Sequence, residues 1–149
     1  MIKSLKGNFY LIALAVAAFS LFSFILQSDP WDSSQLIEPS ALAKKLNDPK
    51  AAKPVILNVG PMEKIKYAKD MGAGASQKGI EAFKAHVDKL PLQQEIVVYC
   101  GCCKLVNCPN IKNTMLYLET RGYTNFKLLN LPTSLEDDWI KKGYPMAAQ

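Results

Sequence analysis

All four cysteines of this 149-residue chain lie in one short segment behind a strand-like run. The segment reads Cys100-Gly101-Cys102-Cys103-Lys104-Leu105-Val106-Asn107-Cys108, and Glu95 to Tyr99 before it is rich in β-branched and aromatic residues. A thiol that ends a strand, ahead of a loop and a helix start, lies near backbone N–H groups and a helix N-terminus, which favour its anionic form. Because the thiolate is the reactive species, we expect the chemistry of this protein in this loop.

Three kinds of chemistry fit these residues. Cys100 alone is a candidate nucleophile, since a residue that ends a strand of a parallel sheet lies at the edge where ligands bind in open α/β folds. Cys100 and Cys103 have the C-x-x-C spacing of a redox pair. Cys100, Cys102, Cys103 and Cys108 together are candidate ligands of Zn or an iron–sulfur cluster, although zinc sites usually draw pairs of ligands from two separate segments.

The elements that must position this loop alternate between strands and helices. Hydrophobic periodicity and the positions of Pro and Gly predict strands over 54–60, 95–99 and 126–129. They predict helices over 39–46, 78–90, 110–121 and 134–142, one helical turn over 62–67, and a loop over 72–75. This alternation favours an α/β fold with a central parallel sheet flanked by helices. His86 lies off the apolar stripe of its helix, and we expect it to be a surface residue rather than a catalytic base.

The first 28 residues are expected to be a signal-anchor or a signal peptide. Phe9 to Leu26 carries no charge and follows Lys3 and Lys6, which favours a membrane anchor with the domain outside the cytoplasm, in the periplasm if the source is a Gram-negative bacterium. Secretion after signal cleavage is the alternative. Residues 29–35 are expected to form a linker, and residues 36–146 a single domain.

The charge pattern argues against nucleic acid as a partner. The formal net charge is +5, and the lysines of the domain are dispersed among acidic residues without a basic stripe.

The four cysteines are too close in sequence to connect distant parts of a fold, so a structural disulfide framework is not expected.

Several segments, in this order along the chain, carry a family resemblance. They are Ile37-Glu38-Pro39-Ser40-Ala41-Leu42, Asn58-Val59-Gly60 in place of a D-V-R motif, Val97-Val98-Tyr99-Cys100, Leu118 to Leu129, and Trp139 to Pro145. On the basis of these segments and their order, residues 36–146 resemble the rhodanese-like domain, the sulfurtransferase fold.

The resemblance implies a function for the cysteine loop. Cys100 would take a sulfane sulfur from a small sulfur-containing donor as a persulfide and pass it to a thiol acceptor, without a metal or another cofactor. Gly101, Cys102, Cys103 and Lys104 would form the substrate-binding loop. We therefore expect the protein to be a rhodanese-like sulfurtransferase or a sulfane-sulfur carrier. This expectation favours an enzyme over a non-catalytic protein. The alternatives are a non-catalytic module that binds a metal or a partner through the loop, and a thiol-disulfide oxidoreductase.

The chain also departs from the family pattern. The loop between Cys100 and the next helix is several residues longer, and Asn58 and Gly60 replace the Asp and Arg of the motif, so a preference for thiosulfate is not carried over. Lys104 is the one cation of the loop and a candidate for binding an anionic donor. Cys102, Cys103 and Cys108 are candidates for resolving a persulfide on Cys100 or for a disulfide within the loop.

Overall fold

The computed structural model describes residues 31–148, in which five strands form one parallel sheet. Every residue of the central strand β4 is buried, and an uninterrupted apolar run of this kind is typical of a parallel strand covered on both faces. The predicted α/β class with a parallel sheet is confirmed. The strand order is β1 (Leu36–Ile37), β5 (Phe126–Leu129), β4 (Ile96–Tyr99), β2 (Val55–Asn58) and β3 (Ala68–Asp70).

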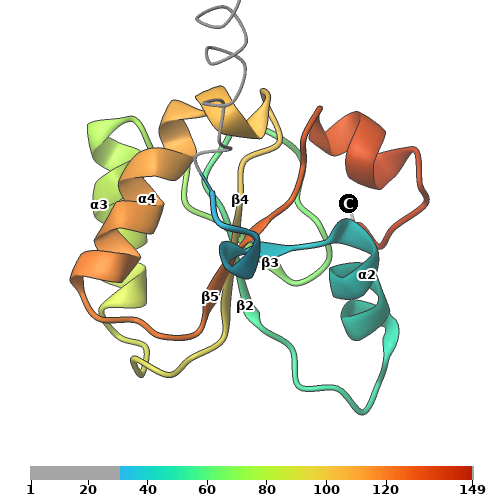
Figure 1. The fold of residues 1–149 in the computed structure, drawn as a ribbon, viewed down its shortest axis with the longest axis horizontal. Helices are drawn as coiled ribbons and strands as arrows, with labels where there is room; N and C mark the ends of the chain where they lie inside the picture. The colour runs from blue at the N-terminus through green and yellow to red at the C-terminus, as the bar shows by residue number, and fades with distance from the viewer. Residues whose placement is uncertain (1–30, 149) are drawn as a thin grey trace, which may run out of the picture. The chain divides into compact units, whose positions relative to one another are not determined.

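Helices cover both faces of the sheet (Figure 1). One face carries α3 (Gln77–Val87) and α4 (Pro109–Thr120), and the other carries α2 (Pro39–Asn47) and a single-turn π-helix, η3 (Glu136–Ile140). Residues of β4 alternate between the two cores, because successive side chains of a strand point to opposite faces. Cys100, the residue after β4, belongs to the core beneath α3 and α4.

The order in which strands are added to the sheet changes direction between two adjacent strands, β2 and β4. From β2 the chain continues to β3 on one side, and from β4 it continues to β5 on the other side. In open α/β sheets, ligands bind outside the carboxyl ends of the strands at such a switch point. The residues that follow these two strands are Val59 and Gly60 after β2, and Cys100 and Gly101 after β4, so the fold places the cysteine loop at this edge.

Most helix starts follow the local signals in the sequence. Pro39 and Pro109 occupy the first turns of α2 and α4, where proline lacks only an N–H that the helix would not use. The Ser76 hydroxyl caps α3 by accepting a hydrogen bond from the Gly79 N–H at 3.0 Å. The last turn of α3 ends at Val87, three residues before the predicted end.

Three local predictions differ from the structure. Residues 62–67 form no helical turn, because Ile65 makes an antiparallel bridge with Met146 and a turn follows. Strand β3 was not predicted, since it is a three-residue edge strand whose Lys69 and Asp70 are exposed and carry no apolar signal. The helix predicted over 134–142 is reduced to η3, in which Trp139 is buried.

The structure also bears on the N-terminal part of the domain. Trp31 packs against the core, and η1 (Ser33–Gln35), within the segment expected to be a linker, is capped by the Asp32 side chain. Across residues 31–148, no helix is both long and apolar enough to cross a membrane. The anchor expected at Phe9 to Leu26 lies outside the described residues.

A buried side-chain amide shapes the end of β2. Asn58 is 1% exposed; its Oδ1 accepts a hydrogen bond from the Gly60 N–H at 3.1 Å, and its Nδ2 donates one to the Met62 carbonyl at 2.8 Å. A carboxylate at this position would accept the first bond but could not donate the second. The turn that leads to Gly60 therefore depends on an amide.

We predict that Asn58→Asp lowers the free energy of unfolding by about 1–3 kcal/mol, because it buries a charge and leaves the Met62 carbonyl without its donor. The loss should be larger at neutral pH than in mild acid, since burial raises the pKa of a carboxyl and the protonated form can again donate. Urea unfolding measures it, with the exposed Asn125→Asp as control. Equal losses in the two variants would contradict this role of Asn58.

Candidate functional site

Cys100 lies between the ends of the two central strands. The side chain is 1% exposed, and its Sγ packs directly against the backbone turn after β2. A Cβ added to Gly60 would lie 2.4 Å from Cys100 Sγ and 2.9 Å from the Cys100 carbonyl oxygen. A residue with a side chain at position 60 would therefore collide with both the sulfur and the backbone of Cys100, which is why glycine stands there.

Two further thiols converge on Cys100. The Sγ atoms of Cys100 and Cys102 are 3.1 Å apart, and the Sγ atoms of Cys100, Cys102 and Cys108 all lie within 4.8 Å of one another. Cys102 is exposed, whereas Cys108 is buried at the N-cap of α4. Cys103 lies at the margin, with its Sγ 3.5 Å from that of Cys102. All four cysteines are free thiols.

The turn that brings Cys102 back to Cys100 depends on the glycine between them. Gly101 has φ of 71°, in the region that glycine adopts without strain, and its carbonyl accepts a hydrogen bond from the Leu135 N–H at 3.0 Å. A Cβ on Gly101 would lie 2.6 Å from the Cβ of Leu135. The approach of η3 to the loop thus fixes the turn and with it the position of Cys102.

Asn110, in the first turn of α4, is a site residue that the sequence analysis missed. Its Nδ2 lies 3.3 Å from Cys100 Sγ and 3.8 Å from Cys102 Sγ, and its Oδ1 accepts a hydrogen bond from the Ala75 N–H at 3.0 Å. That last bond orients the amide so that its N–H groups face the sulfurs. A signal was available, since a polar residue in the first turn of a helix that starts beside the cysteines faces the same edge of the sheet.

The hydrogen bonds make Cys100 the anionic thiol. Its pKa is lowered to about 5, above all by the hydrogen bond from Cys108, with smaller contributions from the Cys102 thiol and N–H and from Asn110, while burial opposes the shift. Burial and hydrogen bonds to Cys100 and Cys103 raise the pKa of Cys102 to about 12. The hydrogen bond to Cys100, followed by burial, raises the pKa of Cys108. The shifts favour the thiolate form at Cys100 and the protonated thiol at Cys102 and Cys108.

The other residues singled out from the sequence lie at or beyond the margin of this cluster. Lys104 is exposed. His86 lies on α3, with its Nδ1 3.3 Å from Lys69 Nζ, and burial together with the charge of Lys69 lowers its pKa. The hydrogen-bond partner of the His86 ring is Lys69 and not a cysteine.

The sulfur cluster could also hold a metal ion. Zinc bound by thiolates has sulfur ligands about 3.8 Å apart in a tetrahedral site, which is within the range of separations of Cys100, Cys102 and Cys108. Cys103 is outside this set of three. The cysteine loop and the start of α4 therefore bring three possible metal ligands close together, although all of them come from one short segment of the sequence.

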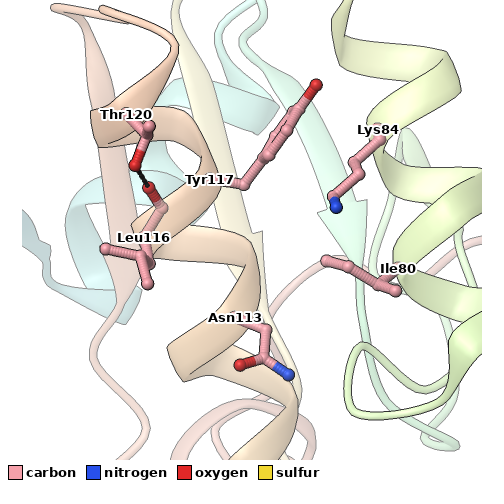
Figure 2. Close-up of a pocket in the computed structure, with 6 residues that line it drawn as sticks. All are labelled: Ile80, Lys84, Asn113, Leu116, Tyr117 and Thr120. Atoms are coloured by element: carbon pink, nitrogen blue, oxygen red, sulfur yellow. Dashed lines mark hydrogen bonds between the residues drawn. The ribbon is translucent and has the colours of Figure 1, made fainter.

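A groove on the surface, separate from the sulfur cluster, has no comparable set of reactive side chains (Figure 2). It is a groove of about 380 Å³ between α3 and α4. The Thr120 hydroxyl donates to the Leu116 carbonyl at 2.7 Å, the Tyr117 hydroxyl donates to Asp88, and Lys84 Nζ lies 5.0 Å from the centre of the Tyr117 ring. Within residues 31–148, no cysteine, histidine or carboxylate side chain lines the groove, so the sulfur cluster is the candidate site. The lining residues are Ile80, Lys84, Asn113, Leu116, Tyr117 and Thr120.

Comparisons with known proteins show the fold alone. No model of a known protein family matches this chain, and no curated protein matches it. Among solved structures, the chain is similar to a Cys-to-Ser variant of EanB in complex with hercynine, with a TM-score of 0.52 and 18% identity. The match covers 76% of this chain and 27% of the EanB chain, so this protein spans about a quarter of the length of its structural neighbour.

We predict that the ultraviolet absorbance of the full chain shows one thiolate that titrates near pH 5 and is absent from Cys100→Ser. Cys108→Ala should move this step to higher pH than Asn110→Ala does, because Cys108 supplies the stronger hydrogen bond to the sulfur. Cys103→Ala is the matched control and should leave the step in place. A first thiolate that persists in Cys100→Ser would contradict the assignment.

Proposed function

We propose that residues 36–146 are a rhodanese-like sulfurtransferase domain in which Cys100 carries a sulfane sulfur as a persulfide. The observation that carries the proposal is a buried thiol with hydrogen-bond donors around it, at the switch point of a parallel sheet. Cys100 follows the central strand, and its sulfur lies 3.1 Å from the Cys102 sulfur, 3.3 Å from the Asn110 amide nitrogen and within 4.8 Å of the Cys108 sulfur. A nucleophile stabilised in this way needs no general base, because it is already deprotonated at neutral pH.

The transfer consists of two displacements. In the first, the Cys100 thiolate attacks the outer sulfur of a donor R–S–SH, a new S–S bond forms on Cys100, and R–S⁻ leaves with the electron pair of the broken bond. In the second, an acceptor thiolate attacks the outer sulfur of the Cys100 persulfide, and Cys100 leaves as the thiolate. The donors that stabilise the Cys100 thiolate also stabilise it as the leaving group.

The departures from the family motif have a common physical reason. Gly60 stands where the motif has Arg, and any side chain there would meet Cys100 Sγ. Without that Arg, an Asp at position 58 would be a buried charge with no partner, whereas Asn58 satisfies both of its hydrogen-bonding groups within the turn. The residues Asn58 and Gly60 therefore support a rhodanese-like site in which the turn after β2 packs directly against the Cys100 sulfur.

The surroundings of the thiolate favour a donor of low charge at the sulfur. Across residues 31–148, no Lys or Arg nitrogen hydrogen-bonds to a cysteine sulfur. Arg121, the one arginine of the sequence, lies at the opposite end of α4 and pairs with Asp88 at 3.1 Å. A dianion such as thiosulfate would approach Cys100 without a cation hydrogen-bonded to the sulfur, so the proposed donor is a hydropersulfide.

Access to Cys100 depends on its exposed neighbour. Cys100 is 1% exposed, while Cys102, 3.1 Å away, is exposed. We propose that a donor approaches Cys100 Sγ from the side of the exposed Cys102, whose side chain moves aside.

We predict that Cys102→Ser, treated as the full chain with one equivalent of glutathione persulfide, takes a sulfur atom on Cys100, and that the double variant Cys100→Ser, Cys102→Ser takes none. The rate should be higher than with thiosulfate at the same concentration, because thiosulfate brings a second charge to the anionic site. Mass spectrometry of the peptide that contains Cys100 measures the uptake in a Cys102→Ser background, where the product is not resolved further. Equal labelling of a Cys100→Ser, Cys102→Ser double variant would remove Cys100 from its role.

A thiophilic metal ion is the second candidate occupant, favoured by the convergence of three sulfurs within 4.8 Å. In that case the loop would serve as a binding module, and Cys100, Cys102 and Cys108 would all be required because each supplies one ligand.

We predict no stoichiometric zinc in the purified, reduced full chain after dialysis, as measured by metal analysis. Cys103→Ser is the matched control for ligand loss, since Cys103 is outside the set of three. One zinc ion per chain that persists in Cys103→Ser, and is lost from Cys100→Ser, Cys102→Ser and Cys108→Ser alike, would favour the binding module over the sulfurtransferase.

A further inference from the structure

The four thiols differ in their access to solvent, although they come from one short loop. Cys100 is 1% exposed and Cys108 is 5% exposed, so a macromolecular acceptor cannot reach either sulfur in this conformation. Cys102 is exposed and in contact with Cys100. A reaction that starts on the Cys100 sulfur therefore reaches solvent through Cys102, the exposed thiol in contact with it.

We infer that Cys102 is the resolving thiol of this site and that it releases the sulfane sulfur of the Cys100 persulfide as hydrosulfide. The inference rests on the proposed persulfide of Cys100 and specifies its fate. The Cys102 sulfur attacks Cys100 Sγ, the inner sulfur of the persulfide, and the bond between the inner and outer sulfurs breaks.

The step balances in atoms and electrons. The Cys102 thiol first transfers its proton to the outer sulfur of the Cys100 persulfide anion, and the resulting Cys102 thiolate then attacks, which gives a Cys100–Cys102 disulfide and HS⁻. The outer sulfur is reduced and the two cysteine sulfurs are oxidised. A dithiol reductant from solution then attacks the disulfide at the exposed Cys102 sulfur, becomes a disulfide itself and restores both thiols.

The distances single out the inner sulfur as the target. Cys102 Sγ is already 3.1 Å from Cys100 Sγ, and a disulfide bond of about 2.0 Å requires them to approach by about 1 Å. The turn at Gly101 holds the two side chains on the same side, and Leu135 fixes this turn through its N–H. The Asn110 amide lies 3.3 Å from Cys100 Sγ and 3.8 Å from Cys102 Sγ, so it contacts both sulfurs that would be joined.

The other two cysteines are less suited to this role. The Cys103 sulfur contacts Cys102 at 3.5 Å and is outside the set of three sulfurs that lie within 4.8 Å of one another. Cys108 is buried at the N-cap of α4, so a disulfide between Cys108 and Cys100 would lie out of reach of a reductant. Cys102 combines contact with the inner sulfur and exposure to solvent.

The test uses the reduced full chain under anaerobic conditions with one equivalent of glutathione persulfide, whose own by-product is glutathione. The wild-type chain should release one equivalent of hydrosulfide and lose two hydrogens in mass. When the product is denatured without reductant, Cys100 and Cys102 should resist alkylation, while Cys103 and Cys108 are alkylated. Cys102→Ser should keep the added sulfur on Cys100 and release no hydrosulfide, and Cys103→Ser, the matched control, should behave as wild type.

The outcomes separate this inference from the function on which it rests. If wild type and Cys102→Ser both keep the sulfur on Cys100, if the sulfur moves to Cys102, or if Cys103→Ser is the variant that blocks release, then Cys102 is not the resolving thiol and the persulfide function stands. If Cys102→Ser melts as wild type does but takes up no sulfur, both proposals are overturned.

Discussion

The site depends on the burial of one negative charge, the thiolate of Cys100. A buried anion is unstable unless hydrogen-bond donors replace the water that it has lost. Here the donors are the thiols of Cys102 and Cys108, the Cys102 N–H and the Asn110 amide. Each belongs to the cysteine loop or to the first turn of α4, so the conformation of this short stretch determines whether Cys100 can be anionic at all.

Close packing around the sulfur explains several residues that chemistry alone does not. Gly60 is required because the sulfur of Cys100 lies against its Cα, and Gly74 because a Cβ there would lie 2.4 Å from the Asn110 carbonyl oxygen. Glycines at these two positions allow the turns after β2 and β3 to approach the central strand and α4. The same approach lets the Ala75 N–H hold the Asn110 amide in its orientation.

Side chains supply most of the hydrogen bonds to the Cys100 sulfur. The position of Cys100 after a strand led us to expect backbone N–H groups near the thiol, and among backbone groups the Cys102 N–H contributes to the lowered pKa of Cys100. Side-chain donors supply the rest. A thiol donor differs from a backbone donor in one respect that matters for function, because it can also form a covalent bond with the sulfur that it stabilises.

The sequence by itself determined the class of the fold and indicated the candidate site. Periodicity and the Pro and Gly boundaries located α2, α3, α4 and the central strands, because those signals are local, and the cysteine loop after β4 marked the site. Strand β3 and η3 were missed or misjudged, since their form depends on the edge of the sheet and on packing of Trp139. Only the tertiary structure decided which thiol is anionic, because burial and donors from Cys108 and Asn110 set that charge and neither can be read from spacing along the chain.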